Sequence, residues 1–356
     1  MQECIMGGVG GVKGSTREAL FYEKLSDMAA VRCLLCPKHC VVAEGRSGFC
    51  RVRRNVGGEL VATGYGRCSA CAVDPIEKKP LYHFYPGSLI LSLGTVGCNL
   101  HCRFCQNWEI AHGDPETYEL TPAEAVEIAL RQKGDDRRVI GMAYTYSEPI
   151  VWYEFVLEAA RLAAQTGLKN VLVTNGVIEA GPMAELLPVI DAMNIDVKSF
   201  NNRYYQEVCA GSLEPVLRTV EAAVRGGCHV EVTTLLVTGL NDSDEEMRDL
   251  ASWLASVDRG IPLHLSRYFP NYRMSIPATP TETLRRCREV ASEYLDYVYT
   301  GNVLDSEGGT TRCPECGTPL LERYGLRLSR SNLVDGSCPR CGRKADVVGT
   351  VFERSY

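Results

Sequence analysis

The sequence predicts an α/β fold, in which an incomplete, TIM-like barrel of six βα units follows a Cys-rich N-terminal segment and precedes a small four-cysteine module. From Ser88 to Val303, short β-rich runs alternate with amphipathic helical runs, a pattern typical of parallel βα units. The 17 cysteines of the 356-residue chain are concentrated in three groups, two of which lie outside this region. Six units are too few to close an ordinary eight-stranded barrel, so an open one is expected.

The individual elements follow from apolar patterning and from capping residues. The expected strands are residues 89–95, 139–145, 170–174, 192–197, 230–237 and 263–268, with a last short strand near 297–303. The expected helices are residues 122–132, 151–165, 214–225 and 245–255. Thr121 and Ser243 stand where helix N-caps are expected, because a hydroxyl can accept a bond from the first free backbone amides.

Four segments are expected along the chain. Residues 1–16 are rich in glycine and aperiodic, which predicts a disordered lead. Residues 17–87 form the Cys-rich N-terminal segment, where metal ligation is expected to replace a large core. The partial barrel covers residues 88–303, and the Cys4 module covers residues 304–356 after a polar, Gly-rich linker. In barrels of this kind, chemistry is expected at the carboxyl ends of the strands.

Composition excludes several classes of function. With 45% hydrophobic and 23% charged residues, the chain is typical of a folded globular protein. A formal net charge of -6 disfavours a general nucleic-acid binder. No run of the sequence reaches the length of a membrane span, and the N-terminus lacks the pattern of a signal peptide. We therefore expect a cytoplasmic protein whose grouped cysteines are metal ligands rather than disulfides.

One cysteine group opens the barrel. Cys98, Cys102 and Cys105 follow the first expected strand with C-x3-C-x2-C spacing. Three thiolates at this spacing can bind three irons of a [4Fe-4S] cluster and leave the fourth iron open to a chelating amine and carboxylate. A zinc knuckle with a distant fourth ligand is the alternative, but zinc knuckles prefer C-x2-C pairs.

This loop resembles the motif of the radical S-adenosylmethionine (SAM) superfamily, C-x3-C-x-aromatic-C, in which Phe104 takes the aromatic position that flanks the adenine. The wider chain resembles the AmmeMemoRadiSam system radical SAM enzymes, which are related to the pyruvate formate-lyase activating enzymes. The stretches that carry this resemblance are CLLCPKHCVVAEGRSGFC (33–50), DPIEKKPLYHFYPG (74–87), CQNW (105–108), AYTYSEP (143–149) and YTGNV (299–303).

The resemblance implies a reaction and its partners. A low-potential electron donor, a ferredoxin or flavodoxin, would reduce the cluster, and SAM would be cleaved to a 5'-deoxyadenosyl radical. That radical would abstract hydrogen from an unknown protein or small-molecule substrate. Activation of a glycyl-radical enzyme is the reaction suggested by the relatives. An RNA-modifying radical SAM enzyme and a non-catalytic metal-binding adaptor are the alternatives.

The resemblance also implies which residues meet SAM. Glu148 keeps the carboxylate of the activating enzymes' Gly-Gly-Glu stretch, although it could instead stabilise a helix N-terminus. Lys198 could contact the SAM carboxylate, and the alternative is a salt bridge with Asp196. The activating enzymes carry an arginine on the fifth strand, where this chain has Thr233 and Thr234. The residues implied to bind the cofactor are Phe104, Asn107, Tyr146, Ser147, Glu148, Thr174, Asn175, Asp196, Lys198 and Gly239.

The two outer cysteine groups indicate further metal sites. Two CPxCG knuckles predict a closed four-thiolate site of the zinc-ribbon kind, holding zinc or a rubredoxin-like iron. Its ligands are Cys313, Cys316, Cys338 and Cys341. The N-terminal group predicts a metal or a second cluster of unassigned type. Its candidate ligands are Cys33, Cys36, Cys40, Cys50, Cys68 and Cys71.

Overall fold

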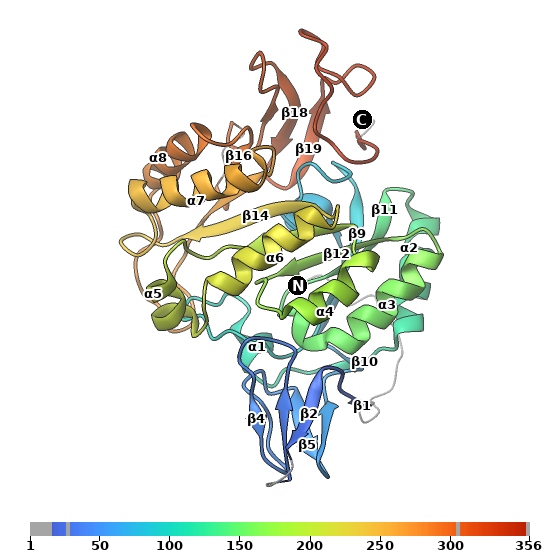
Figure 1. Cartoon of the computed structure of the whole chain (residues 1–356). Helices are drawn as coiled ribbons and strands as arrows, with labels where there is room; N and C mark the ends of the chain where they lie inside the picture. The colour runs from blue at the N-terminus through green and yellow to red at the C-terminus, as the bar shows by residue number, and fades with distance from the viewer. Residues whose placement is uncertain (1–15, 26–28, 304–306, 354–356) are drawn as a thin grey trace.

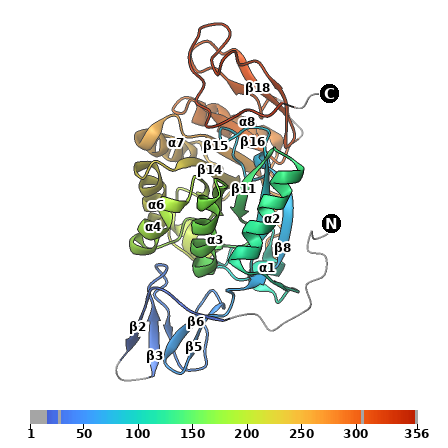
Figure 2. The ribbon, with the colours of Figure 1, turned by 90° about the vertical axis from the view of Figure 1, so that its right-hand side faces the viewer.

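The computed structural model describes residues 16–25, 29–303 and 307–353. Residues 1–15 of the predicted lead and residues 304–306 of the predicted linker lie outside these ranges. The chain is arranged in three parts: small N-terminal sheets at one end, a central sheet covered by helices, and a C-terminal β module at the opposite end (Figures 1 and 2). No helix among the described residues is long and apolar enough to cross a membrane.

The central sheet has eight strands in the order β16-β15-β14-β13-β12-β11-β9-β8. Seven of them run parallel, and their bounds are β9 Leu89–Gly94, β11 Val139–Tyr144, β12 Lys169–Thr174, β13 Ala192–Asp196, β14 His229–Leu236, β15 Leu263–Arg267 and β16 Val298–Gly301. Each parallel strand of the predicted barrel is present within a few residues of its expected bounds. The α/β class is confirmed, and the sheet is mostly parallel.

The eighth strand was not predicted. β8 (Ala70–Pro75) pairs antiparallel with β9, from Ala70 opposite Gly94 to Pro75 opposite Leu89. It lies in the segment that the sequence assigns to the Cys-rich N-terminal part. The barrel sheet therefore recruits an edge strand from the chain that precedes the first βα unit.

Helices cover the sheet on its outer side (Figure 1). The α-helices are α1 Trp108–His112, α2 Pro122–Asp135, α3 Tyr153–Gln165, α4 Ala180–Leu186, α5 Asn202–Tyr204, α6 Glu214–Arg225, α7 Asp244–Asp258 and α8 Thr281–Ser292. Thr121 and Glu124 form a capping box at the start of α2, and the Ser243 hydroxyl accepts from the Glu246 amide at the start of α7. Both predicted N-caps are confirmed.

Short elements complete these helical layers. They are η1 Ile76–Lys78, η2 Pro149–Trp152, η3 Leu187–Val189 and the single π-turn η4 Tyr205–Cys209. The predicted helix over residues 151–165 thus begins as a 3-10 turn, with Pro149 at its first position, where the absence of a backbone N–H costs no hydrogen bond.

The N-terminal segment contains more regular structure than a metal-stapled loop. It forms two three-stranded sheets, β1-β6-β5 and β2-β3-β4, and its strand β7 pairs with β10 (Tyr118–Glu119). The strand bounds are β1 Arg17–Glu18, β2 Tyr22–Leu25, β3 Ala30–Cys33, β4 Val41–Val42, β5 Arg53–Val56, β6 Glu59–Ala62 and β7 Arg67–Cys68. All strands are short, so little apolar area is buried within each sheet.

The C-terminal module is a three-stranded antiparallel sheet of β17 Thr311–Arg312, β18 Pro319–Tyr324 and β19 Arg327–Ser331. It docks against the end of the barrel at which the parallel strands begin. There the buried guanidinium of Arg323 donates to the Tyr82 carbonyl at 2.6 Å, and the Tyr297 hydroxyl donates to Asp346 at 2.6 Å. The two Cys-rich ends of the chain therefore lie at opposite ends of the barrel.

Candidate functional site

The C-x3-C-x2-C loop leaves the carboxyl end of β9, where the barrel rule places chemistry. Cys102 is buried, and Cys98 and Cys105 are half-buried. The loop is fixed against η4, because the His101 amide donates to the Cys209 carbonyl at 2.8 Å and the Arg103 amide to the Val208 carbonyl at 2.9 Å. The three thiols are thus held at the barrel mouth by backbone bonds that do not involve their own side chains.

The surroundings of these thiols fit an anionic cluster. The Leu100 amide donates to the Cys98 sulfur at 3.4 Å, and the Asn107 amide donates to Cys105. The side-chain amide of Asn175 also donates to the Cys98 sulfur, at 3.7 Å. Donors that point at sulfur stabilise thiolates and tune the metal that they bind. The donor set therefore fits the [4Fe-4S] cluster that the motif predicts.

Glu148 is fully buried and holds the ends of two strands together. Its carboxylate accepts from the Thr174 hydroxyl at 2.6 Å, the Asn175 amide at 2.8 Å and the Ile150 amide at 3.0 Å. Burial raises the pKa of Glu148 to about 7, against the opposing effect of these hydrogen bonds. A carboxylate has about four acceptor positions, so one remains for a ligand. Glu148 thus caps the N-terminus of η2, which is the alternative role that the sequence indicated. Its contact with SAM remains a prediction.

Asp196 is the last residue of β13, and it forms an ion pair with Lys198, two residues later, with 2.9 Å between Lys198 Nζ and Asp196 Oδ2. Burial disfavours the charged lysine, but Asp196 and the nearby thiols Cys102 and Cys209 outweigh it and raise the pKa of Lys198. The salt bridge proposed as the alternative is present, and its ammonium lies beside the cluster loop. Lys198 is therefore placed to offset thiolate charge, while its approach to the SAM carboxylate remains a prediction.

The cysteine loop also contacts the segment that follows β11, which contains Tyr146 and Ser147. Tyr146 has a positive φ of 69°, and its carbonyl accepts from the Asn107 side chain at 2.7 Å. The neighbouring Ser147 hydroxyl oxygen is buried without a hydrogen-bond partner among the described residues. A buried hydroxyl left unpaired is costly, so an absent polar ligand is the natural partner. This orphaned oxygen fits the SAM site that the resemblance implies.

Two implied cofactor residues have structural explanations of their own. Phe104 is buried, with its ring centroid 6.2 Å from that of Tyr204. Gly239 has a φ of 76° in the turn after β14, and its amide donates to Asp242 at 2.7 Å. No atom lies within 4 Å of a β-carbon built at Gly239, so the turn conformation, rather than close packing, requires glycine there.

Sequence reasoning missed two features of the site. Cys209, which lies outside the three cysteine groups, is in hydrogen-bond contact with Cys102, and this contact lowers the pKa of Cys102. The second feature is an ion-pair network in which Asp74 Oδ2 lies 2.7 Å from the buried Lys79 ammonium and accepts from the Tyr146 hydroxyl. Burial lowers the pKa of Lys79 to about 8. Asp74 and Lys79 lie in the stretch 74–87 that carries the family resemblance, but nothing in the sequence indicated that they contact Tyr146.

The C-terminal cysteines converge as predicted. The sulfurs of Cys313, Cys316, Cys338 and Cys341 all lie within 4.8 Å of one another. The pairs Cys313–Cys341 and Cys316–Cys338 are 3.5 and 3.6 Å apart. Tetrahedral zinc at about 2.3 Å from each sulfur needs sulfurs about 3.8 Å apart. The site therefore has the geometry of a mononuclear metal centre.

Replacing Cys338 with serine is expected to remove about one equivalent of zinc or iron per chain, because closed Cys4 sites need all four thiolates. The module between residues 307 and 353 should then become sensitive to protease, since metal binding supplies folding free energy there. Elemental analysis and limited proteolysis measure both effects. Cys228→Ser, which changes a buried cysteine outside the three groups, is the matched control, and equal metal content in the two variants would contradict the site.

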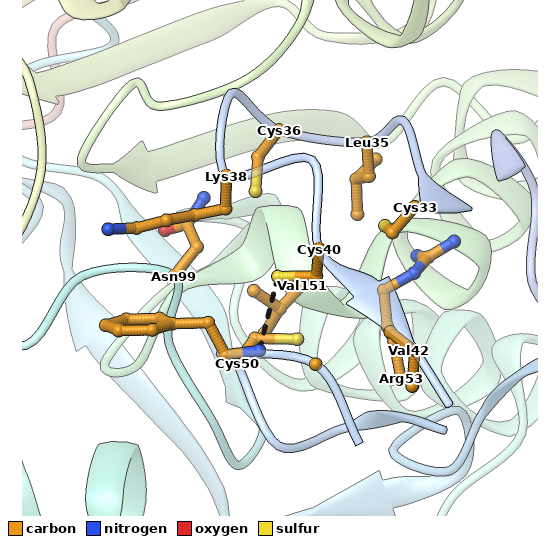
Figure 3. A pocket seen from close by; sticks show the side chains of 12 residues that line it. Cys33, Leu35, Cys36, Lys38, Cys40, Val42, Cys50, Arg53, Asn99 and Val151 are labelled. Carbon is orange, nitrogen blue, oxygen red and sulfur yellow. Dashed lines mark hydrogen bonds between the residues drawn. The ribbon is translucent and has the colours of Figure 1, made fainter. Parts of the chain in front are cut away.

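Four of the six N-terminal cysteines line one pocket, namely Cys33, Cys36, Cys40 and Cys50 (Figure 3). Cys68 and Cys71 are not among the residues of this pocket. They lie on β7 and β8, where both side chains are buried. The N-terminal group is thus divided by the fold, and a metal at Cys68 and Cys71 remains a prediction.

A cluster-type cysteine loop at the carboxyl end of a mostly parallel sheet, with an orphaned polar atom beside it, is the arrangement expected of a protein that binds an iron–sulfur cluster and SAM. The Radical SAM superfamily model matches residues 92–254 of the chain. An uncharacterized protein of Methanocaldococcus jannaschii is 45% identical over 340 residues, which cover 93% of this chain and 99% of that protein. The chain belongs to the radical SAM superfamily and is an enzyme.

More distant relatives carry named activities. The pyruvate formate-lyase-activating enzyme of Streptococcus mutans serotype c is 25% identical over 193 residues, which cover 51% of this chain and 73% of that enzyme. Among solved structures, a radical SAM methyltransferase from Sphaerobacter thermophilus aligns with 66% of this chain and 71% of its own, at 19% identity and a TM-score of 0.49. These names describe the relatives.

Proposed function

We propose that the protein cleaves SAM reductively and uses the resulting radical to abstract hydrogen from a protein or small-molecule substrate, in the manner of an activating enzyme. The observation that carries this proposal is the loop of Cys98, Cys102 and Cys105 at the end of β9, with backbone and side-chain donors directed at its sulfurs. A reduced [4Fe-4S] cluster held there supplies the electron for cleavage of the sulfonium bond.

The chain's own residues would bind and orient the reactants. Cys98, Cys102 and Cys105 would hold three irons of the cluster, and Asn175 fixes the orientation of Cys98 through bonds to its sulfur and, at 2.9 Å, to the Asn99 side chain. The Ser147 hydroxyl and the remaining acceptor position of Glu148 are available to the polar groups of SAM. The Lys198 ammonium lies beside the loop, where it offsets the negative charge of the thiolates.

The direct test follows the abstracted hydrogen. The reconstituted, dithionite-reduced enzyme and SAM are incubated without oxygen with extract of the encoding organism grown in deuterated medium, divided into protein, RNA and small-molecule fractions. Deuterium in the recovered 5'-deoxyadenosine is expected with the protein or the small-molecule fraction. Deuterium with the RNA fraction alone would support RNA modification instead, and unlabelled 5'-deoxyadenosine with every fraction would contradict hydrogen abstraction.

A further inference from the structure

We propose that Cys33, Cys36, Cys40 and Cys50 bind a second iron–sulfur cluster, of the [4Fe-4S] type, which passes electrons to the radical SAM cluster. The four side chains come from the end of β3 and from the loops before and after β4, and they line one pocket (Figure 3). Four thiolates that surround one site are the complete ligand set of such a cluster. This inference rests on the proposed function for its electron acceptor only.

Each of these sulfurs receives a backbone donor. The amides of Leu35, Lys38 and Val52 donate to the cysteine two residues earlier, Cys33, Cys36 and Cys50 respectively, and the Phe49 amide donates to Cys40 at 3.4 Å. The same relation between a cysteine and the amide two residues later occurs at Cys98 in the radical SAM loop. Such N–H···S bonds stabilise metal-bound thiolates. The N-terminal loops are thus shaped as ligand loops rather than as packing around free thiols.

The charge around the pocket also fits an anionic cluster. Arg53 lines the pocket and is only 2% exposed, yet its Nε atom has no hydrogen-bond partner among the described residues. Its terminal nitrogens are paired with Glu154, 3.0 Å away. Lys38 also lines the pocket. A buried guanidinium N–H without a hydrogen-bond partner is costly, so the Arg53 Nε–H is available to donate to an anionic cluster bound by the four thiolates.

The spacing of the sulfurs distinguishes a cluster from a single metal ion. In the C-terminal module, the four sulfurs lie within 4.8 Å of one another, as mononuclear zinc requires. Among the described residues, the four C-terminal cysteines are the one group that converges in this way, and neither the N-terminal cysteines nor those of the radical SAM loop do. In a cubane cluster each thiolate binds a different iron, so the sulfurs stand farther apart. In this respect the N-terminal cysteines resemble the radical SAM loop rather than the mononuclear C-terminal site.

The pocket is directly connected to the radical SAM loop. Asn99, the residue after Cys98, lines the pocket, and its side chain accepts from Asn175, which also donates to the Cys98 sulfur. On the other side of Cys98, a β-carbon added to Gly97 would lie 2.7 Å from the Cys50 carbonyl oxygen. The two residues that flank Cys98 thus contact the N-terminal group: Asn99 lines its pocket, and Gly97 lies against the backbone of Cys50.

The proposed transfer involves one electron at each step. A low-potential protein donor of the flavodoxin or ferredoxin class reduces the N-terminal cluster from the 2+ to the 1+ state. This cluster returns to 2+ when it reduces the radical SAM cluster from 2+ to 1+. The same electron is then consumed in cleaving the carbon–sulfur bond of SAM to methionine and the 5'-deoxyadenosyl radical.

The first experiment tests the cluster without depending on SAM chemistry. A Cys98→Ala/Cys102→Ala/Cys105→Ala variant is reconstituted with iron and sulfide, and its acid-labile sulfide, iron and zinc are measured together with its EPR spectrum after reduction. We expect about four sulfides per chain and a [4Fe-4S]+ signal. Absence of labile sulfide, or zinc in the pocket, would overturn the proposal even if the wild-type enzyme cleaves SAM.

The second experiment tests the relay. In Cys36→Ser/Cys40→Ser, 5'-deoxyadenosine formation is measured once with dithionite and once with reduced flavodoxin, and Cys228→Ser serves as the control. The ratio of flavodoxin-driven to dithionite-driven rate is expected to fall at least about tenfold, because only the small reductant can bypass the relay. An unchanged ratio would overturn the relay. Loss of cleavage in wild type with both reductants would instead contradict the proposed function.

Discussion

Replacing Cys102 with alanine is expected to abolish 5'-deoxyadenosine formation by the reduced enzyme. Cys102 is the most deeply buried of the three loop cysteines, and the backbone bonds of His101 and Arg103 to η4 fix its position. Loss of one of three thiolates leaves an iron without a protein ligand, so the cluster is expected to be lost or incomplete. The measurement is chromatographic detection of 5'-deoxyadenosine after anaerobic reduction.

The thiol of Cys209 requires a second variant in this experiment. Because Cys209 contacts Cys102, it could provide a replacement ligand in the single variant, so Cys102→Ala/Cys209→Ala is tested in parallel. Cys287→Ala, which changes a buried cysteine of α8, is the matched control and is expected to retain activity. Activity at the wild-type level in the double variant would contradict the assignment of the cluster ligands.

Replacing Glu231 with alanine is expected to destabilise the protein by about 3–5 kcal/mol, the usual effect of breaking a buried charged network. Glu231 is inaccessible to solvent, and its carboxylate accepts from the Tyr82 and His83 amides at 2.9 and 2.8 Å. His264 lies 2.6 Å and His229 3.0 Å from the same carboxylate. This network joins β14 and β15 to the loop on which the C-terminal module docks. Chemical denaturation of the metal-loaded protein measures the effect.

The pH dependence supplies a separate test of Glu231. Burial opposes its ionisation, but the bonds from the two histidines outweigh this and lower its pKa well below the usual range. The stabilising contribution is therefore present above the ordinary glutamate pKa of about 4.3 and is lost as pH falls towards the lowered value. The stability gap between wild type and Glu231→Ala should narrow in acid. Equal stability of the two proteins at neutral pH would contradict this role.

The parallel strands of the central sheet could be predicted from sequence because their signals are local. Strands buried on both faces, such as β11 with its sequence VIGMAY, read as continuous apolar runs. β8 could not be found in this way, since ACAVDP has half-buried positions and a terminal proline. Its place is decided by pairing with β9, which is a tertiary contact.

In the candidate site, too, local features could be predicted from sequence and tertiary contacts could not. Cys98, Cys102 and Cys105 share one loop, so their spacing predicts their chemistry. Cys209 is about a hundred residues away in the sequence and has no partner cysteine at a metal-ligand spacing, so only the docking of η4 reveals its contact with Cys102. For the N-terminal group, the sequence could not show that Cys33, Cys36, Cys40 and Cys50 line one pocket while Cys68 and Cys71 lie on β7 and β8, because this division depends on the fold.

The charged site residues were harder to interpret from sequence. The roles implied for Glu148 and Lys198 rest on their positions in the sequence, which do not show how many of their hydrogen bonds are already made within the protein. In the structure Glu148 accepts three hydrogen bonds and Lys198 pairs with Asp196. His264 on β15 belongs to the Glu231 network, with its Nε2 atom 2.6 Å from the Glu231 carboxylate.

The most direct test of the central claim is the EPR spectrum of the reduced enzyme, recorded with and without SAM before turnover. If Cys98, Cys102 and Cys105 hold a cluster with an open iron, SAM should change the spectrum of that cluster in the wild type. No corresponding change should occur in the Cys98→Ala/Cys102→Ala/Cys105→Ala variant. A reduced cluster in the wild type whose spectrum does not change with saturating SAM would contradict the account.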